Sequence, residues 1–282
     1  MKKFNKGLIK SIPIIMTIKV LYVGGWGVKN DSYTMTPFET ERKIFEIRDF
    51  SNRAHDALRE NTDIELTTMT SWEAYANFPR ELEKLQEYNV MVNQTTEADV
   101  YLLYPEFYFR DLWDTEKTIV LPNRLEIIRK FVEDGGGFLQ VGGWFGLGAG
   151  KFARAQWHNT PVEKVHAVEF LEVDDRVEAP EGAYVSVIKE DHPIMKGIPW
   201  DECPPFLGYN RVKRKKEGEL LANIEAREQG LIDPFIAVRE YGKGRSMAVM
   251  SAIHPHWGAN FMKWKYYKQF LWQTINWLAH KL

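Results

Sequence analysis

Short apolar runs alternate with amphipathic stretches through the first 150 residues, and this alternation limits the possible folds more than any other feature. The apolar runs indicate strands at 19–23, 64–69, 99–104 and 138–141, and the amphipathic stretches indicate helices at 44–58, 79–88 and 124–133. Strands that alternate with helices favour a parallel sheet joined by right-handed crossovers. We therefore predict an α/β fold with a doubly wound, mainly parallel sheet, helices on both faces and a ligand crevice at the C-terminal ends of the strands.

The second half of the chain is richer in strands. Short strand patterns lie at 170–173, 184–188, 206–212 and 219–224, a hairpin is expected from 235–240 and 246–251 around the turn 241–244, and a closing helix runs from about 260 to 280. The sequence contains no repeat, no low-complexity tract and no linker rich in proline or serine. We therefore predict a single domain over 16–282 with extra strands in its second half.

The N-terminal segment does not fit a membrane anchor. Four lysines within residues 1–10 precede an uncharged run at 11–18, which has fewer than half of the about 20 apolar residues that a spanning helix needs. A strand pattern follows directly. We interpret residues 1–15 as an N-terminal extension outside the fold, either disordered or a mis-assigned start.

Charge and cysteine content exclude several classes of protein. The 282 residues include 37 basic and 39 acidic side chains, so the net charge of −2 provides no general attraction for nucleic acid or an anionic membrane. The basic run at 211–216 is interpreted as a solvated strand end. A single cysteine, Cys203, allows neither an internal disulfide nor a thiolate zinc site, which fits a reducing cytoplasm.

The loop after the fourth predicted strand has the pattern of a nucleophile elbow. Residues 140–146 combine a strand end, a tight glycine turn and an expected helix start, with Trp144 in the central position. An indole cannot attack a carbonyl, so such an elbow would have no nucleophile. The alternative is a glycine-rich turn on which Trp144 is simply packed.

Two histidines follow the apolar run 247–253. His254 and His256 are two residues apart on an extended segment, so both imidazoles are expected to face one crevice. A metal pair would need a third ligand, and none is evident nearby, so we predict no metal. Histidines with purely structural hydrogen bonds are the alternative.

These motifs resemble those of class I glutamine amidotransferases, whose Cys-His-Glu triad hydrolyses glutamine in a flavodoxin-like fold. Trp144 stands in the elbow Gly142–Gly146 where the cysteine belongs, and His256 stands after His254-Pro255 where the glutamate belongs. More closely, the chain resembles amidotransferase-like proteins related to the trehalose-utilisation (ThuA-like) family. That resemblance covers most of 16–282 and lies in the stretches 135–144, 157–163, 191–197, 205–210 and 255–257.

Cys203 is a poor replacement for the missing nucleophile. Asp201 and Glu202 precede it and would raise the pKa of a thiol, and Pro204 and Pro205 follow it and prevent an elbow helix. We interpret Cys203 as a structural thiol and expect glutaminase activity to be absent.

The function that fits best is binding or processing of a small polar molecule, with a sugar as the candidate, because aromatic faces stack on C–H surfaces while imidazole and amide groups form hydrogen bonds with hydroxyls. The catalytic candidates are His254 and His256, and the expected ligand-binding residues are Gly25, Trp26, Gly143, Trp144, Trp157, His158, Asn210 and Trp257. We expect no cofactor, nucleic acid or membrane partner, and a homo-oligomer. The alternatives are a structural or scaffolding homo-oligomeric subunit and an active glutaminase.

Overall fold

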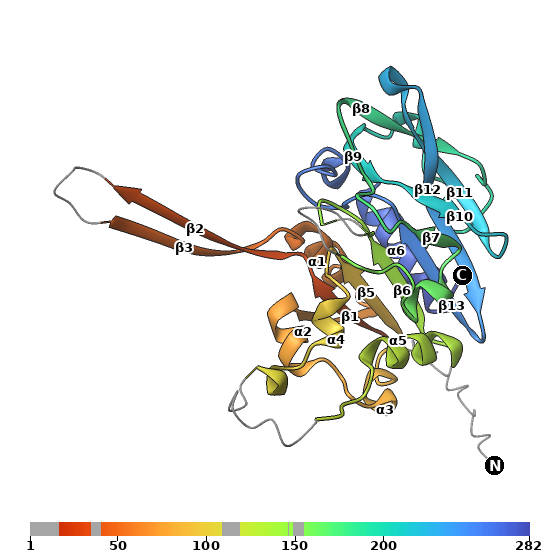
Figure 1. Cartoon of the computed structure of the whole chain (residues 1–282). Helices are drawn as coiled ribbons and strands as arrows, with labels where there is room; N and C mark the ends of the chain where they lie inside the picture. Colours follow the sequence, from red (N-terminus) through yellow and green to blue (C-terminus); the bar gives the residue numbers. More distant parts are fainter. Residues whose placement is uncertain (1–16, 35–40, 109–118, 146, 149–154) are drawn as a thin grey trace, which may run out of the picture.

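A nine-stranded sheet forms the centre of the computed structural model, which describes residues 17–34, 41–108, 119–145, 147–148 and 155–282. The strand order is β4-β1-β5-β6-β13-β12-β11-β8-β9 (Figure 1). The first five strands pair in parallel: β4 Ile64–Met69, β1 Ile18–Gly24, β5 Val90–Gln94, β6 Gly137–Val141 and β13 Gly244–Val249. Every residue of β5 and β6 is buried, as expected for strands covered on both faces.

The other four strands extend the sheet in antiparallel fashion: β12 Leu231–Tyr241, β11 Glu219–Ala226, β8 Arg176–Val187 and β9 Phe206–Asn210. The predicted hairpin is confirmed, because Tyr241 and Gly244 close the β12–β13 turn. Two separate pairs complete the strands: β7 Val168–Phe170 with β10 Val212–Arg214, and β2 Trp26–Thr34 with β3 Glu41–Asp49. The predicted α/β class, with extra strands in the second half, is therefore confirmed.

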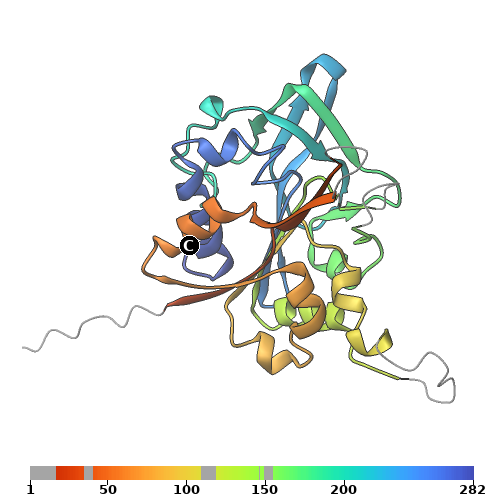
Figure 2. The ribbon, with the colours of Figure 1, turned by 90° about the vertical axis from the view of Figure 1, so that its left-hand side faces the viewer.

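Helices cover both faces of the sheet (Figure 2). One face holds α1 Asn52–Arg59 and α6 Tyr267–Leu278, and the other holds α2 Ser71–Asn77, α3 Leu82–Leu85, α4 Asp99–Leu102 and α5 Arg124–Glu133. Single-turn 3₁₀ helices lie at Pro105–Phe107, Val162–Val165, Trp200–Glu202, Arg227–Gln229 and Phe261–Lys263. The Trp272 indole of α6 donates to the Ala57 carbonyl of α1 at 2.6 Å, so the first and last helices are tied together.

The strand predicted at 99–104 is wrong. Residues Asp99–Leu102 form α4, and the central strand is β5 instead. The end of β5 escaped the apolar pattern because it contains Asn93 and Gln94, both fully buried. The Tyr101 hydroxyl donates to Asn93 Oδ1 at 2.5 Å and so satisfies a polar group that the pattern would place in a loop.

The helix predicted from residue 44 is also wrong, because Glu41–Asp49 is the strand β3 and α1 begins only at Asn52. Phe45 and Ile47 alternate with polar residues at a period of two, and Ile47 pairs with Val28 of β2. The resulting hairpin projects from the body of the molecule between β1 and α1 (Figure 1).

Four further expectations need correction or lie outside the described residues. No helix follows the glycine turn within the described residues 142–145 and 147–148, which form turns and bends. The closing helix starts at Tyr267 rather than near 260, and the helix expected at 79–88 is the single turn α3. The predicted extension 1–15 lies outside the residues that the structure describes.

The helices beside β5 are joined by a buried cation. Arg124 follows the Asn123 N-cap of α5 and is fully buried. Its guanidinium donates to five backbone carbonyls, those of Ala74, Tyr75, Val100, Tyr101 and Leu103, at 2.6–3.3 Å. Its guanidinium carbon also lies 4.1 Å from the centroid of the Tyr104 ring. One side chain thus fixes α2 and α4 against α5.

We predict that Arg124→Met lowers the free energy of unfolding by at least about 3 kcal/mol, because five carbonyls lose their donor without gaining water. Urea unfolding followed by circular dichroism measures this. Lys130→Met on the exposed side of α5 is the control and should change stability by no more than about 0.5 kcal/mol. Equal midpoints for the two variants would contradict the role given to Arg124.

Candidate functional site

A cavity of about 440 Å³ lies where the C-terminal ends of the parallel strands meet. Gly25 follows β1, Thr95 follows β5, Trp144 follows β6 and His254 lies in the segment after β13. The lining residues are Gly25, Trp26, Gly27, Val28, Phe50, Thr95, Trp144, Phe145, His254, Pro255 and His256. This is the edge of an open parallel sheet where ligands bind.

Five of the residues predicted from the sequence line this cavity together: Gly25, Trp26, Trp144, His254 and His256. The ring centroids of Trp144 and His256 are 5.3 Å apart, so the glycine turn and the histidine segment face each other. Gly143 supports the turn from behind, with a φ of 145° that favours glycine. Its N–H donates to Asn210 Oδ1 at 2.8 Å.

The other four predicted ligand-binding residues lie outside the cavity lining. Asn210, Trp157 and Trp257 are buried, and each uses its polar atoms within the protein. The Trp157 indole donates to the Thr96 carbonyl at 3.0 Å, and the Trp257 indole donates to Glu178 Oε2 at 3.0 Å. His158 bonds the Phe170 carbonyl and Glu172 on a different part of the surface. We therefore assign these residues to supporting the fold around the site.

Thr95 is a lining residue that sequence reasoning missed. It follows β5 directly with a φ of 50°, in the left-handed region that a β-branched residue rarely adopts. Its Oγ1 lies 3.0 Å from Nε2 of His254 and accepts a hydrogen bond from the Gln94 amide at 2.7 Å. Polar residues at the end of a buried strand indicate a site of this kind. The sequence pattern did not indicate Thr95, because it predicts the third strand at 99–104 and not at Val90–Gln94.

His254 is held as a neutral imidazole. Burial lowers the pKa of His254 to about 4, and the neighbouring His256 acts in the same direction. Nδ1 of His254 meets the Pro255 carbonyl, which can only accept, so Nδ1 carries the proton and donates. Nε2 therefore presents its lone pair to the Thr95 hydroxyl.

A second histidine, His55, packs against the lining residue Trp26, with ring centroids 6.1 Å apart. Nδ1 of the buried His55 is 2.8 Å from Asp49 Oδ2, and burial lowers the pKa of His55 despite that carboxylate. Nε2 of His55 and the indole nitrogen of Trp26 have no hydrogen-bond partner among the described residues. Within the same residues, no three His, Cys, Asp or Glu side chains are grouped to hold a metal ion. Trp26 lines the cavity, and its unpartnered indole nitrogen is buried behind that wall.

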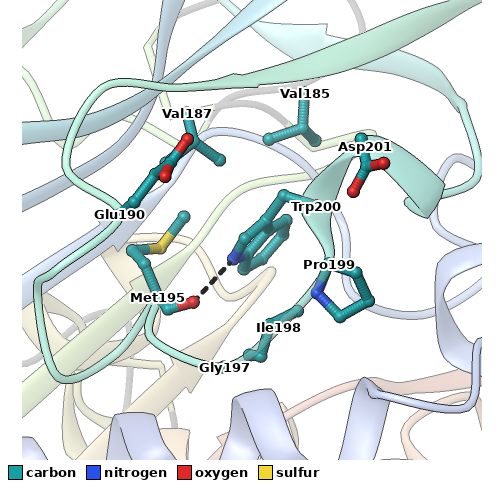
Figure 3. Close-up of a pocket in the computed structure, with 9 residues that line it drawn as sticks. All are labelled: Val185, Val187, Glu190, Met195, Gly197, Ile198, Pro199, Trp200 and Asp201. Carbon is teal, nitrogen blue, oxygen red and sulfur yellow. Dashed lines mark hydrogen bonds between the residues drawn. The ribbon is translucent and has the colours of Figure 1, made fainter.

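Another hollow, of about 450 Å³, lies on the antiparallel half of the molecule (Figure 3). The Trp200 indole at its base donates to the Met195 carbonyl at 3.2 Å, and the charged lining residues are Glu190 and Asp201. Its lining has no histidine, cysteine, serine or threonine. We therefore assign the candidate site to the cavity at the parallel strand ends.

The model of a family described as "Putative glutamine amidotransferase" (GATase1_like) matches residues 26–280. The chain belongs to this family. The resemblance inferred from the sequence is thereby confirmed. None of the curated proteins is significantly similar to the chain. No helix among the described residues is long and apolar enough to cross a membrane.

Solved structures agree with this membership. The cytoplasmic protein STM3548 of Salmonella typhimurium is 27% identical with a TM-score of 0.80, and the alignment covers 93% of this chain and 99% of that one. The cytoplasmic protein STM1381 of the same organism is 27% identical with a TM-score of 0.79 at the same coverages. A ThuA-like protein of Bacteroides uniformis shares the fold at 13% identity, with a TM-score of 0.55 and coverages of 97% and 95%.

The single cysteine of the chain lies away from the candidate site. Trp144 lies in a turn, and the described residues that follow it, 145 and 147–148, are turn and bend. Cys203 is buried outside the cavity lining, and burial raises the pKa of its thiol to about 12. A thiol with this pKa supplies no thiolate at neutral pH.

We predict that the protein releases no ammonia from glutamine above a buffer blank, measured with a coupled glutamate dehydrogenase assay. Trp144→Cys should remain inactive as well, because His256 occupies the place of the orienting carboxylate. Ammonia release that disappears in Cys203→Ser would show that this reading of Cys203 is wrong.

Proposed function

We propose that the protein binds a small polar molecule with an apolar face, most simply a sugar, in the cavity between Trp26, Trp144 and His256. The observation that carries the proposal is the combination of aromatic walls with the hydrogen-bonding groups of Thr95, His254 and His256 at the strand ends. Trp144 is 44% exposed although it is a large aromatic side chain, and it faces the cavity. Aromatic faces exposed in this way stack on the C–H surface of a sugar ring.

The Trp144 ring is held in place before any ligand arrives. The Arg176 guanidinium carbon lies 4.7 Å from the centroid of the Trp144 ring, and Asp174 fixes that guanidinium through bonds of 2.7 and 2.8 Å. The ring of Trp257 supports the indole, with a centroid separation of 6.5 Å. A rigid aromatic wall loses little conformational entropy on binding, which favours recognition of weakly binding small molecules.

We predict that Trp144→Ala raises the dissociation constant for the bound sugar about tenfold, since a lost aromatic contact is worth about 1.5 kcal/mol. Calorimetry with glucose, galactose, xylose and maltose measures this. Trp72→Ala is the matched control, because Trp72 is 40% exposed but lies on α2 outside the cavity. Absence of binding by all four sugars to the wild-type protein would overturn the sugar assignment.

Two finer assignments accompany this proposal. The parallel strands follow the order 2-1-3-4-5 when counted along the chain, which supports a flavodoxin-like arrangement of that half of the sheet. The single cysteine and the cytoplasmic relatives from Salmonella typhimurium support placement in the cytoplasm.

The hairpin of β2 and β3 favours a second role, assembly with another copy of the chain. Val28, Phe45 and Ile47 share one face of the hairpin and are exposed. A two-stranded hairpin gains little stability by itself, and an exposed apolar face marks an interaction surface. The same face continues through Trp26 into the cavity, so a second copy seated on it would also cover the site.

We predict that the wild-type protein is a homo-oligomer and that Phe45→Glu shifts it to the mass of a monomer, because a charge would be buried in the contact. Light scattering after size-exclusion chromatography measures the mass. Ile232→Glu is the control, since Ile232 and Phe45 are both 68% exposed but Ile232 lies on β12. A monomeric wild-type protein would remove this role.

A further inference from the structure

The backbone at Thr95 adopts a conformation that is unfavourable for its residue type. Among the described residues, four that are not glycine have a positive φ: Thr95, Gln156, Asn159 and His280. Thr95 is the β-branched member of this set, for which the left-handed region is least favourable. It lies between β5 and α4, on a strand–turn–helix connection that presents its side chain to the cavity. Strained residues of this kind cluster at active sites.

The Thr95 hydroxyl has a base beside it. Its Oγ1 lies 3.0 Å from His254 Nε2, within the range of a nucleophile and its general base. The Pro255 carbonyl accepts from Nδ1 of His254 and thereby keeps the lone pair on Nε2. The pKa of His254, lowered by burial, keeps the ring neutral, while the charge of Asp49 favours the imidazolium that forms when it accepts a proton.

A hydrogen-bonded chain also orients the Thr95 oxygen. The Tyr22 hydroxyl donates to Gln94 Oε1 at 3.1 Å, which fixes the amide, and Gln94 Nε2 donates to Thr95 Oγ1 at 2.7 Å. The Gly142 carbonyl lies 3.1 Å from the same oxygen and is a second acceptor for its proton. The hydroxyl hydrogen is therefore shared between the Gly142 carbonyl and His254, and transfer to His254 needs no movement of the ring.

We propose that Thr95 is a nucleophile with His254 as its general base, acting on small uncharged carboxylic esters in the cavity. The inference rests on the proposed ligand cavity and deepens it. No lining residue is Asp, Glu, Lys or Arg, which fits an uncharged substrate and disfavours a zwitterion such as glutamine. The aromatic walls fit the acyl or alcohol part, and an ester carbonyl is more electrophilic than an amide.

The reaction balances without a co-reactant other than water. Thr95 Oγ1 forms a bond to the carbonyl carbon, its proton passes to His254 Nε2, and the carbonyl π pair moves to oxygen. The tetrahedral intermediate then breaks its bond to the alcohol oxygen, which takes the proton from Nε2. Water next attacks the acylated Thr95 with His254 as base, and release of the carboxylic acid restores the hydroxyl.

The full-length protein is tested with p-nitrophenyl acetate. We expect p-nitrophenol release above the buffer blank and an acetyl group on Thr95 in peptide mapping by mass spectrometry. Thr95→Val and His254→Gln should each lower the rate at least about 100-fold, while Thr95→Ser, which keeps the hydroxyl, retains activity. Thr68→Val on β4 is the matched control and should leave the rate unchanged.

The outcomes separate this proposal from ligand binding itself. Three outcomes would each overturn the proposal. They are acetylation of another residue such as His256 in place of Thr95, a Thr95→Val variant as fast as the wild type, and no p-nitrophenol release above the blank. If Thr95→Val fails to fold, Thr95→Ser and the peptide map still decide. Sugar binding without acylation of Thr95 would support the proposed ligand binding and overturn the proposed catalysis. Acylation of Thr95 without sugar binding would support the catalysis and overturn the assignment of a sugar as ligand.

Discussion

The site depends on a buried polar clamp that joins the two halves of the sheet. Asn210, at the end of β9, accepts from the Gly143 N–H at 2.8 Å and donates to both the Gly143 carbonyl and Asp175 at 3.2 Å. Asp175 in turn accepts from the N–H groups of Leu147 and Gly148, each at 2.8 Å. The antiparallel half thereby fixes the turn that carries Trp144. Because both side chains are buried, loss of either would leave buried polar atoms of the turn or of the other side chain without a partner, which is costly.

Burial sets the hydrogen-bonding character of two imidazoles at and beside the cavity, those of His254 and His55. Burial lowers the pKa of both His254 and His55, so each imidazole ring is uncharged at neutral pH. An uncharged ring has one nitrogen that donates a hydrogen bond and one that accepts. The cavity that His254 and the aromatic walls line has no Asp, Glu, Lys or Arg among its lining residues. Such a site discriminates by shape, stacking and hydrogen bonds, and it gives the Thr95 hydroxyl a neighbour that can take its proton.

The chain belongs to the amidotransferase-like family but has Trp144 where class I glutamine amidotransferases have their cysteine. The two facts are compatible, because a fold does not specify a reaction. The sheet brings several strand ends to one edge whatever residues stand there. In this chain, Trp144 provides a wall where the resemblance would place a nucleophile. The β5 turn, one strand away, places Thr95 against the same histidine segment. The edge of the sheet is therefore retained while the reactive position differs.

Local sequence determined several elements whose buried positions are apolar, together with the meeting of Trp26, Trp144 and His254. The α5 helix and the β12–β13 hairpin follow from short-range periodicity and turn residues, and the site residues meet because parallel strands end at one edge. Only the tertiary structure decided the position of β5, the conformation of Thr95 and the supporting roles of Asn210 and Trp157. The physical reason is that a buried polar residue such as Asn93 is stable only with partners distant in the chain, here Tyr101 and Gln140, and no local pattern encodes them.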